Sequence, residues 1–305
     1  MYTRRQFGAL TLGGLAWTRL ATAGIDSRVA GVRLGAQSYS FRDLPRGPSG
    51  DAIDSIIDAF VRVGFGECEL WAPQVEPPSG GLQPSEGARQ ALRAWRLETP
   101  LDHFRAIRKK FDAAGISIYA YNYSPNSSYT DAEIDRGFEM AKALGAGIIT
   151  SSTTIEVAKR IAPFAENHKM VVAMHGHSNT SLPGEFAAPE SFAEAMKMSK
   201  HFKVNLDIGH FTAANFDAVR YLREQHRHVT NLHIKDRKKN QGDNVPWGTG
   251  EGDAKGMLTE LKRQGYKGCT SIEYEHGTVA ELDENLPKCV KFFDDVMKEL
   301  ARAIQ

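Results

Sequence analysis

Short apolar runs alternate with longer amphipathic stretches along most of the chain, from residue 32 onward. Short runs rich in β-branched and aromatic residues predict buried strands, and apolar positions spaced three or four residues apart predict helices. The predicted strands cover residues 32–40, 68–72, 116–124, 146–152, 169–175, 202–210, 228–236 and 269–276. The predicted helices cover residues 51–63, 99–115, 130–145, 154–167, 189–200, 213–225, 254–264 and 279–302.

This regular alternation predicts parallel strands joined by right-handed helical crossovers. Over residues 24–305 it fits a single-domain α/β protein, a (β/α)8 TIM barrel. A doubly wound open sheet is the alternative, and such a sheet carries a glycine-rich turn after its first strand. Residues 37–44 (QSYSFRDL) contain no glycine, so the barrel is preferred.

Two segments interrupt the repeat. Residues 72–98 form a Pro- and Gly-rich insertion after the second predicted strand, and residues 235–253 form a second long loop after the seventh. Loops of this length inside a compact domain are usually functional or disordered. In a barrel both would lie at the carboxyl ends of the strands, where active sites are found.

The first 23 residues have the layout of an export signal. Arg4 and Arg5 precede a mildly apolar, glycine-rich stretch, and residues 21–23 (ATA) supply a small-residue cleavage site. The arginine pair resembles the twin-arginine (Tat) type. We therefore expect a Tat-like signal peptide over residues 1–23, a periplasmic product and no membrane span after cleavage. A cytoplasmic terminus with a chance arginine pair is the alternative.

The charge balance of the chain is close to neutral. The formal net charge is +1, and without residues 1–23 the count is 35 basic against 37 acidic side chains. Such a balance gives no support for a nucleic-acid partner or an anionic membrane surface. A small-molecule partner is expected instead, and a homo-oligomer is compatible with the composition.

Four consecutive predicted strands carry a metal-ligating residue near their carboxyl ends: His175, Asp207, His233 and Glu273. In a barrel these ends meet at one face, and side chains on a strand alternate between its two sides, so all four can point into the mouth. Buried charges are costly unless paired, and one divalent cation satisfies two carboxylates and two imidazoles at once. Because two donors are imidazoles, Mn²⁺, Co²⁺, Fe²⁺ or Zn²⁺ is expected over Mg²⁺. Salt-bridged polar residues without a metal are the alternative.

Four segments of the chain carry a family resemblance: VNLDIGH (204–210), NLHIKDR (231–237), WGTGEGD (247–253) and SIEYEH (271–276). With them, residues 32–300 resemble the xylose isomerase-like TIM-barrel superfamily, which includes sugar phosphate isomerases/epimerases, ketose 3-epimerases and inositol-catabolism dehydratases and isomerases. The resemblance implies that Asp207, His233 and Glu273 bind the metal and that His210 and Arg237 contact substrate.

One position departs from the pattern of the ketose 3-epimerases. Their fifth strand ends in a glutamate that binds the metal and acts as an acid/base group, and His175 stands at that place here. We expect His175 to bind metal and His177 to face substrate. A symmetric two-carboxylate epimerisation is then lost, which leaves one-sided proton abstraction beside a metal-polarised carbonyl. Glu273 or His210 would act as base, and Lys235 would stabilise the oxyanion.

Three further side chains are candidate substrate contacts. Glu69 on the second predicted strand reaches either the substrate or a buried ionic partner. Trp71 and Trp247 could form an apolar wall against sugar C–H groups, although a single aromatic residue is more typical of a core. The glycines at 248, 250 and 252 would suit a phosphate only if a helix began directly after them, so an ordinary loop is preferred.

These observations favour an exported, metal-dependent sugar isomerase or epimerase. A 3-keto-glycoside or inosose lyase, dehydratase or hydratase on the same fold is the first alternative, and the histidine at position 175 favours it. An AP endonuclease-like phosphodiesterase would need a three-zinc site and a DNA-binding face, against which the near-neutral charge argues. A non-catalytic sugar-binding protein is disfavoured by Lys235, Arg237 and Glu273 around the metal set.

Overall fold

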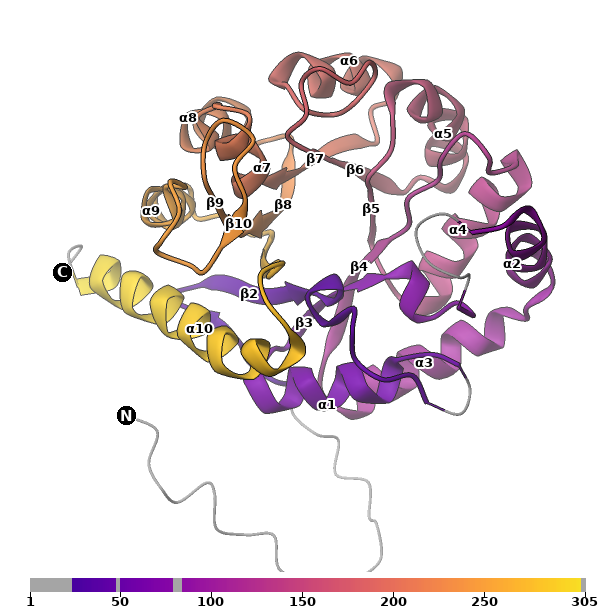
Figure 1. Cartoon of the computed structure of the whole chain (residues 1–305), viewed down its shortest axis with the longest axis horizontal. Coiled ribbons are helices and arrows are strands. Elements are labelled where there is room, and N and C mark those ends of the chain that lie inside the picture. Colours follow the sequence, from indigo (N-terminus) through magenta and orange to yellow (C-terminus); the bar gives the residue numbers. More distant parts are fainter. Residues whose placement is uncertain (1–23, 48–49, 79–83, 303–305) are drawn as a thin grey trace, which may run out of the picture.

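Eight parallel strands close into a barrel, and helices form a ring around it (Figure 1). The computed structural model describes residues 24–47, 50–78 and 84–302. Neighbouring strands pair in chain order, and the last strand, β11, pairs with the first, β2, which closes the barrel. The barrel strands are β2 (Val32–Gln37), β3 (Glu67–Trp71), β4 (Ser117–Asn122), β5 (Ile148–Ser151), β6 (Val171–His175), β7 (Phe202–Asp207), β8 (Val229–Ile234) and β11 (Cys269–Ile272). The predicted (β/α)8 barrel is confirmed.

Helices connect successive strands and cover the outside of the barrel (Figure 1). Three short strands lie outside the regular repeat of the described residues. Strand β1 (Arg28–Val29) extends the sheet antiparallel to β2, and β9 (Asp236–Arg237) pairs with β10 (Asn244–Val245). The helices are α1 (Ile53–Val63), α2 (Glu86–Glu98), α3 (Leu101–Ala113), α4 (Asp131–Leu144), α5 (Ile155–His168), α6 (Pro189–Met198), α7 (Ile208–Ala213), α8 (Ala218–Gln225), α9 (Ala254–Gln264) and α10 (Val279–Arg302).

Local sequence signals set the ends of α4. Thr130 accepts a hydrogen bond from the Glu133 backbone N–H, and the Glu133 carboxylate accepts one from the Thr130 backbone N–H, which is a complete capping box. The helix ends at Gly145, whose φ of 79° lies in the left-handed region that glycine adopts without strain. Residues 131–144 therefore form a helix for reasons present in their own sequence.

The structure corrects two expectations about element bounds. The sixth strand was expected to run to His210, but β7 ends at Asp207, because the Asp207 side chain caps α7 and turns the chain into a helix. The insertion at 72–98 was expected to be a loop, yet α2 begins after the N-cap Ser85 and packs against α4 at the outer edge of the ring (Figure 1).

The barrel has an apolar outer layer and a polar interior. Most buried hydrophobic side chains form one cluster between the strands and the surrounding helices. Inside the barrel, the carboxylate of Glu69 on β3 accepts hydrogen bonds from residues of four other strands, β2, β4, β5 and β8. The interior thus contains a buried charged group directly below the carboxyl-end face.

The predicted signal peptide at 1–23 lies outside the residues that the structure describes. Within the described ranges, no helix combines the length and apolarity needed to cross a bilayer.

Candidate functional site

The four predicted metal ligands meet at the carboxyl ends of their strands. His175 ends β6, Asp207 ends β7, His233 lies in β8, and Glu273 directly follows β11. One ligand atom from each lies within 4.8 Å of the others, and all four residues are buried. The register of β7 and β8 pairs Asp207 with His233, which places these two at the same depth.

Asp207 is positioned by its role at the end of β7. Its Oδ1 accepts a hydrogen bond of 2.7 Å from the backbone N–H of His210, as the N-cap of α7. Its other oxygen, Oδ2, accepts no hydrogen bond. The buried Nδ1 of His175 has no hydrogen-bond partner either. Buried polar atoms are nearly always satisfied, so two orphaned donor atoms of metal-ligating type in one cluster fit a bound cation.

The ammonium of Lys235 lies among the same carboxylates. Its Nζ is 2.6 Å from Glu273 Oε2, 3.1 Å from Asp207 Oδ2 and 3.3 Å from Glu275 Oε1. Burial alone would lower the pKa of Lys235, but these carboxylates raise it above its usual value. A divalent ion held by the four ligands would share Asp207 Oδ2 and Glu273 Oε2 with this ammonium.

The pKa values of the two carboxyl groups are shifted in opposite directions. Burial raises the pKa of Asp207 to about 7, although Lys235 opposes the shift. For Glu273 burial acts in the same direction, but Lys235 and His233 outweigh it and hold the pKa well below its usual range. Glu273 is therefore the permanently ionised member of the pair, and Asp207 is the one that binds a proton when no metal competes.

Glu69 holds the imidazole of His233 from below. Its Oε2 lies 2.8 Å from His233 Nε2, so this nitrogen donates to the carboxylate and Nδ1 faces Asp207 and Glu273. Outer carboxylates of this kind fix the tautomer and orientation of metal-binding histidines. Glu69 was expected to reach either the substrate or a buried ionic partner. Its carboxylate turns to the barrel interior, where it meets His233, and it is not among the residues that line the cavity described next.

A cavity of about 160 Å³ opens beside the ligand set. Trp71 forms part of its wall and meets Tyr39 edge-to-face, with ring centroids 4.8 Å apart. The remaining wall is polar, with amide, hydroxyl, imidazole and carboxylate groups. The lining residues are Gln37, Tyr39, Trp71, Asn122, Ser152, His175, His177, His210, Glu273 and Glu275.

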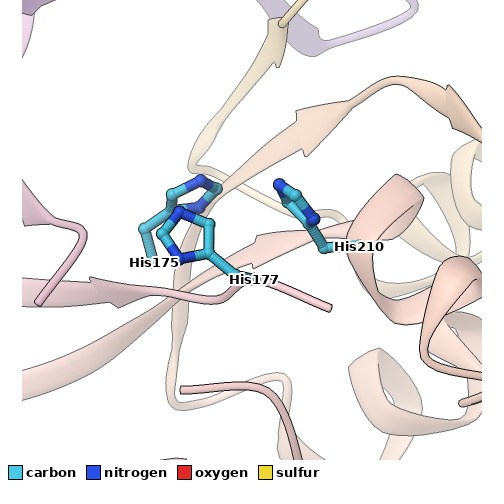
Figure 2. A group of neighbouring side chains, drawn as sticks. All are labelled: His175, His177 and His210. Atoms are coloured by element: carbon cyan, nitrogen blue, oxygen red, sulfur yellow. The ribbon is translucent and has the colours of Figure 1, made fainter. Parts of the chain in front are cut away.

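Three imidazoles stand at the mouth of this cavity (Figure 2). His177 follows β6, and His210 on α7 faces it with a centroid separation of 5.2 Å. Nitrogen atoms of His175, His177 and His210 lie within 4.8 Å of one another. Burial and the nearby Lys235 lower the pKa of His210 well below its usual value, so this ring is neutral.

Two further predicted substrate contacts, Arg237 and Trp247, also lie outside the cavity wall. Arg237 instead donates to His210 Nδ1 at 2.8 Å and to Ser178 Oγ at 3.0 Å, so it reaches the cavity only through His210. Trp247 lies in a separate cavity and meets Phe292 edge-to-face at 6.0 Å. The predicted aromatic wall therefore contains Trp71 but not Trp247.

The glycine-rich segment after β10 encloses a carboxylate of the chain itself. The backbone N–H groups of Gly248 and Gly250 donate to Asp236 Oδ2 at 2.9 and 2.8 Å, and that of Gly252 donates to Oδ1 at 3.2 Å. A Cβ atom at position 250 would stand 1.8 Å from Asp236 Oδ1, so only glycine fits there. These amides hold the loop that carries Arg237 and are already occupied.

Sequence reasoning missed several residues of the site. Glu185, whose Oε2 lies 3.1 Å from His177 Nδ1, comes from an irregular segment with no periodic signal. Gln37, Asn122 and Ser152 line the cavity from positions at the ends of the early strands. Reading the carboxyl ends of β2, β4 and β5 as closely as those of the later strands would have found these three.

The fold agrees with a comparison against known families. A family model described as xylose isomerase-like TIM barrel matches residues 57–296. The chain belongs to this family. No curated protein sequence matches it. Family membership confirms the resemblance inferred from the four sequence segments.

Solved structures with this xylose isomerase-like fold cover nearly the whole barrel. A D-tagatose 3-epimerase-like protein is 15% identical, with a TM-score of 0.64 over 90% of this chain and 100% of the other. The probable 3-DHS dehydratase AsbF from Bacillus anthracis is 14% identical, with a TM-score of 0.62 over 85% and 98%. The IOLI protein with a bound zinc atom is 15% identical, with a TM-score of 0.62 over 88% and 99%.

The donor set of this family member suits a first-row transition metal. His175 and His233 offer imidazole nitrogens, and Asp207 and Glu273 offer carboxylate oxygens. Mixed nitrogen and oxygen donors favour Zn²⁺, Mn²⁺, Fe²⁺ or Co²⁺, whereas Mg²⁺ prefers oxygen donors and several waters.

Proposed function

We propose that this chain is a metal-dependent isomerase or epimerase of a carbohydrate or cyclitol, and that it abstracts a proton from the carbon next to a carbonyl. The observation that supports this most directly is that two buried atoms beside a polar cavity, His175 Nδ1 and Asp207 Oδ2, have no hydrogen bond. A divalent cation bound to His175, Asp207, His233 and Glu273 would supply Lewis-acid polarisation of a substrate oxygen.

The charges of the site fit the stabilisation of an enediolate. Lys235 stays protonated, because three carboxylates raise its pKa, and its ammonium balances part of the negative charge that develops on oxygen. Glu273 stays ionised and is a weak base, because Lys235 and His233 hold its pKa low. Its lowered basicity suits metal binding better than proton abstraction from carbon.

The cavity favours a small polyhydroxylated substrate. Its volume of about 160 Å³ is below the ~300–1,000 Å³ typical of pockets for drug-sized ligands. Gln37, Asn122 and Ser152 offer donors and acceptors for hydroxyl groups, and Trp71 with Tyr39 offers an apolar surface for C–H groups. This wall supports a monosaccharide or cyclitol over a long oligosaccharide.

A carbon–oxygen lyase, dehydratase or hydratase is the second candidate. His175 replaces one of the two carboxylates that a symmetric epimerisation uses, so removal and return of a proton on opposite faces loses one acid/base group. Elimination needs a base on one face only. The likeness to a probable 3-DHS dehydratase supports this candidate at the level of the fold.

Deuterium incorporation would separate these reactions. The metal-loaded protein would be incubated in D₂O with ketoses, inososes and 3-keto-glucosides, and followed by NMR and mass spectrometry. Deuterium next to the carbonyl with an intact skeleton is expected for an isomerase or epimerase. Exchange with loss of water or an aglycone would support the lyase, and no exchange with any of them would contradict proton abstraction.

We further propose that the protein is exported through a Tat-like signal at residues 1–23 and acts in the periplasm. The arginine pair at positions 4 and 5 and the small residues at 21–23 support this. The Arg4→Lys/Arg5→Lys double variant should then accumulate uncleaved in the cytoplasm, as seen by cell fractionation and N-terminal sequencing. Equal periplasmic amounts of variant and wild type would contradict the proposal.

A further inference from the structure

The imidazoles of His177 and His210 face each other across the cavity mouth, but the Nδ1 atoms of the two rings contact groups of opposite charge. Both rings line the cavity, and their centroids are 5.2 Å apart (Figure 2). His177 Nδ1 contacts a carboxylate, whereas His210 Nδ1 contacts a guanidinium. A neutral imidazole carries one proton on one of its two nitrogens, so the partner of Nδ1 decides what Nε2 can do.

Glu185 fixes the proton of His177 on Nδ1. Its Oε2 lies 3.1 Å from this nitrogen, and the hydrogen bond from His177 lowers the pKa of Glu185, so the carboxylate is ionised and only accepts. Nδ1 must therefore donate. In the neutral ring Nε2 then carries a lone pair, which is the state of a proton acceptor.

Arg237 imposes the opposite tautomer on His210. A guanidinium only donates, so His210 Nδ1 accepts the 2.8 Å hydrogen bond and the ring proton is on Nε2. Arg237 is held in place by the carbonyl of Gly242 at 3.0 and 2.7 Å. Lys235 Nζ also lies 3.3 Å from His210 Nε2, and an ammonium likewise only donates. A neutral ring accepts at one nitrogen only, so one of the two contacts is not a hydrogen bond, and we assign the acceptor to Nδ1 because its contact with Arg237 is the shorter.

We propose that Glu185 and Arg237 are positioning residues that fix opposite tautomers, which makes His177 the proton acceptor and His210 the hydrogen-bond donor of the reaction. This inference rests on the proposed function. The proton leaves the substrate carbon for His177 Nε2, and the C–H electron pair forms the new C=C bond. The carbonyl π pair moves onto oxygen, to which His210 Nε2–H donates. In an isomerisation His177 returns this proton to the former carbonyl carbon, and the proton of the hydroxyl group on the carbon that lost it passes to the former carbonyl oxygen, so atoms and electrons balance.

A second metal ion on the three histidines is the competing interpretation. His175, His177 and His210 have nitrogens close enough to share an ion. Ligation needs a lone pair, and His210 Nε2 bears the ring proton while Arg237 donates to Nδ1. The charges of Lys235 and Arg237 next to this ring also disfavour a further cation.

Nitrogen-15 NMR of the histidines would test the tautomers directly. In the metal-loaded wild type we expect Nδ1–H on His177 and Nε2–H on His210. Glu185→Met should release the His177 tautomer, and Arg237→Met that of His210. Glu185→Gln keeps an acceptor oxygen and should keep the wild-type pattern. The reverse assignment at either ring in the wild type would overturn the proposal.

Deuterium exchange into the substrate would test the roles. Glu185→Met should lower kcat for exchange about 100-fold, within the range for loss of general-base catalysis, with KM nearly unchanged. Glu185→Gln should recover most of that loss, and Glu194→Met on the exposed side of α6 is the matched control. Unchanged kcat in Glu185→Met, with metal content intact, would refute the role of His177.

Two outcomes separate this inference from the proposed function. If the wild type exchanges no substrate proton, the proposed function fails and the two roles fail with it, while NMR still decides the tautomers. If the wild type exchanges but the Glu185 variants match it, only the inference fails. Two metal ions per chain would contradict the donor assignment at His210.

Discussion

Two buried ionic clusters differ in how completely their polar atoms are paired. We define the Arg96 cluster as Glu76, Arg96 and Glu133, and the mouth cluster as His175, Asp207, His233, Lys235 and Glu273. Both consist of nearly fully buried charged or ionisable residues on several elements. Burial and charge alone therefore do not distinguish a structural cluster from a functional one.

The Arg96 cluster is closed. Arg96 on α2 donates twice to Glu76, at 2.7 and 2.8 Å, and once to Glu133 at 3.2 Å. Glu133 also accepts from Arg93 and Thr130, and the guanidinium of Arg96 lies 4.4 Å from the Tyr129 ring centroid. Every charge has a partner, so this cluster stabilises the docking of α2 on α4 and has no free donor for a ligand.

The mouth cluster is open. Asp207 Oδ2 and His175 Nδ1 have no hydrogen bond, although both are buried. Asp207 Oδ2 has an ion-pair contact, with Lys235 Nζ at 3.1 Å, but no hydrogen bond. Leaving buried polar atoms without hydrogen bonds costs free energy, and a site keeps that cost only where a ligand recovers it. The pairing of individual atoms, and not the number of charges, identifies the functional cluster.

Of the substitutions that test the difference between the two clusters, Asp207→Asn should have the largest effect. An amide oxygen can still cap α7, so the fold and the position of His210 should be retained, while the ionised ligand is lost. We expect the variant to lose most of its bound metal and its activity, measured by elemental analysis and substrate exchange. Asp217→Asn is the matched control, because Asp217 caps α8 through Arg220 N at 2.8 Å. Full metal content in Asp207→Asn would exclude the proposed ligand set.

Arg96→Ala should act on stability alone. Removing one partner of a buried ion pair leaves uncompensated charges and costs about 3–5 kcal/mol. We expect the free energy of unfolding in urea to fall by that amount, with metal content per folded chain unchanged. The exposed Arg105, paired with Asp102 on α3, is the control, since its substitution by alanine should have little effect. Loss of metal in Arg96→Ala would show that the clusters are coupled.

Glu69→Gln should weaken metal binding without removing a ligand. The amide keeps the shape of the side chain but no longer holds the proton of His233 Nε2 as firmly, and outer-partner changes of this kind cost about 10–100-fold in metal affinity or activity. Calorimetric titration with Zn²⁺ or Mn²⁺ would measure the change. Glu67→Gln on the same strand, where Glu67 pairs with Arg33, should leave the affinity as it is.

Metal affinity should depend on pH through Asp207. Burial raises its pKa to about 7, so in the metal-free protein the carboxyl is protonated below that pH and ionised above it. Protons and metal compete for the same oxygen, so affinity is full above pH 7 and falls below it, by at most about tenfold per pH unit for one proton. An affinity independent of pH between 5 and 8 would contradict the raised pKa.

The smallest effect is expected for Trp247→Phe. Its ring lines a cavity apart from the histidines, so kcat/KM should change little, whereas Trp71→Phe alters the wall of the cavity beside the candidate metal ligands and should raise KM. Steady-state kinetics on the substrate found by deuterium exchange would compare the two. A larger loss of kcat/KM in the Trp247 variant than in the Trp71 variant would indicate that the substrate binds nearer to α10.

The alternation of strands and helices was sufficient to predict the barrel, because eight repeats leave few topologies. The ligand set followed from geometry that all barrels share, since the carboxyl ends of adjacent strands lie at one face. The spacing of Asp207 and His210 also carries a local signal, the contact of an N-cap side chain with the backbone three residues on, and this explains why β7 ends where it does.

The missed features depend on how irregular segments fold. Helix α2 was hidden by the prolines and glycines before it, and its stability comes from Arg96, whose partners are distant in sequence. Glu185 reaches His177 through a segment whose path no periodicity describes. Trp247 and Arg237 share one loop, and only its folded path shows that one turns to α10 and the other to His210.

The amides of Gly248, Gly250 and Gly252 around Asp236 have a consequence for the choice of substrate. A tethered carboxylate competes for these amides at an effective concentration on the order of millimolar or more. A phosphate group of a substrate would have to displace it, so the loop offers no affinity to phosphorylated sugars. The same bonds order the loop before substrate arrives, so Arg237 and the His210 ring that it contacts need little further ordering.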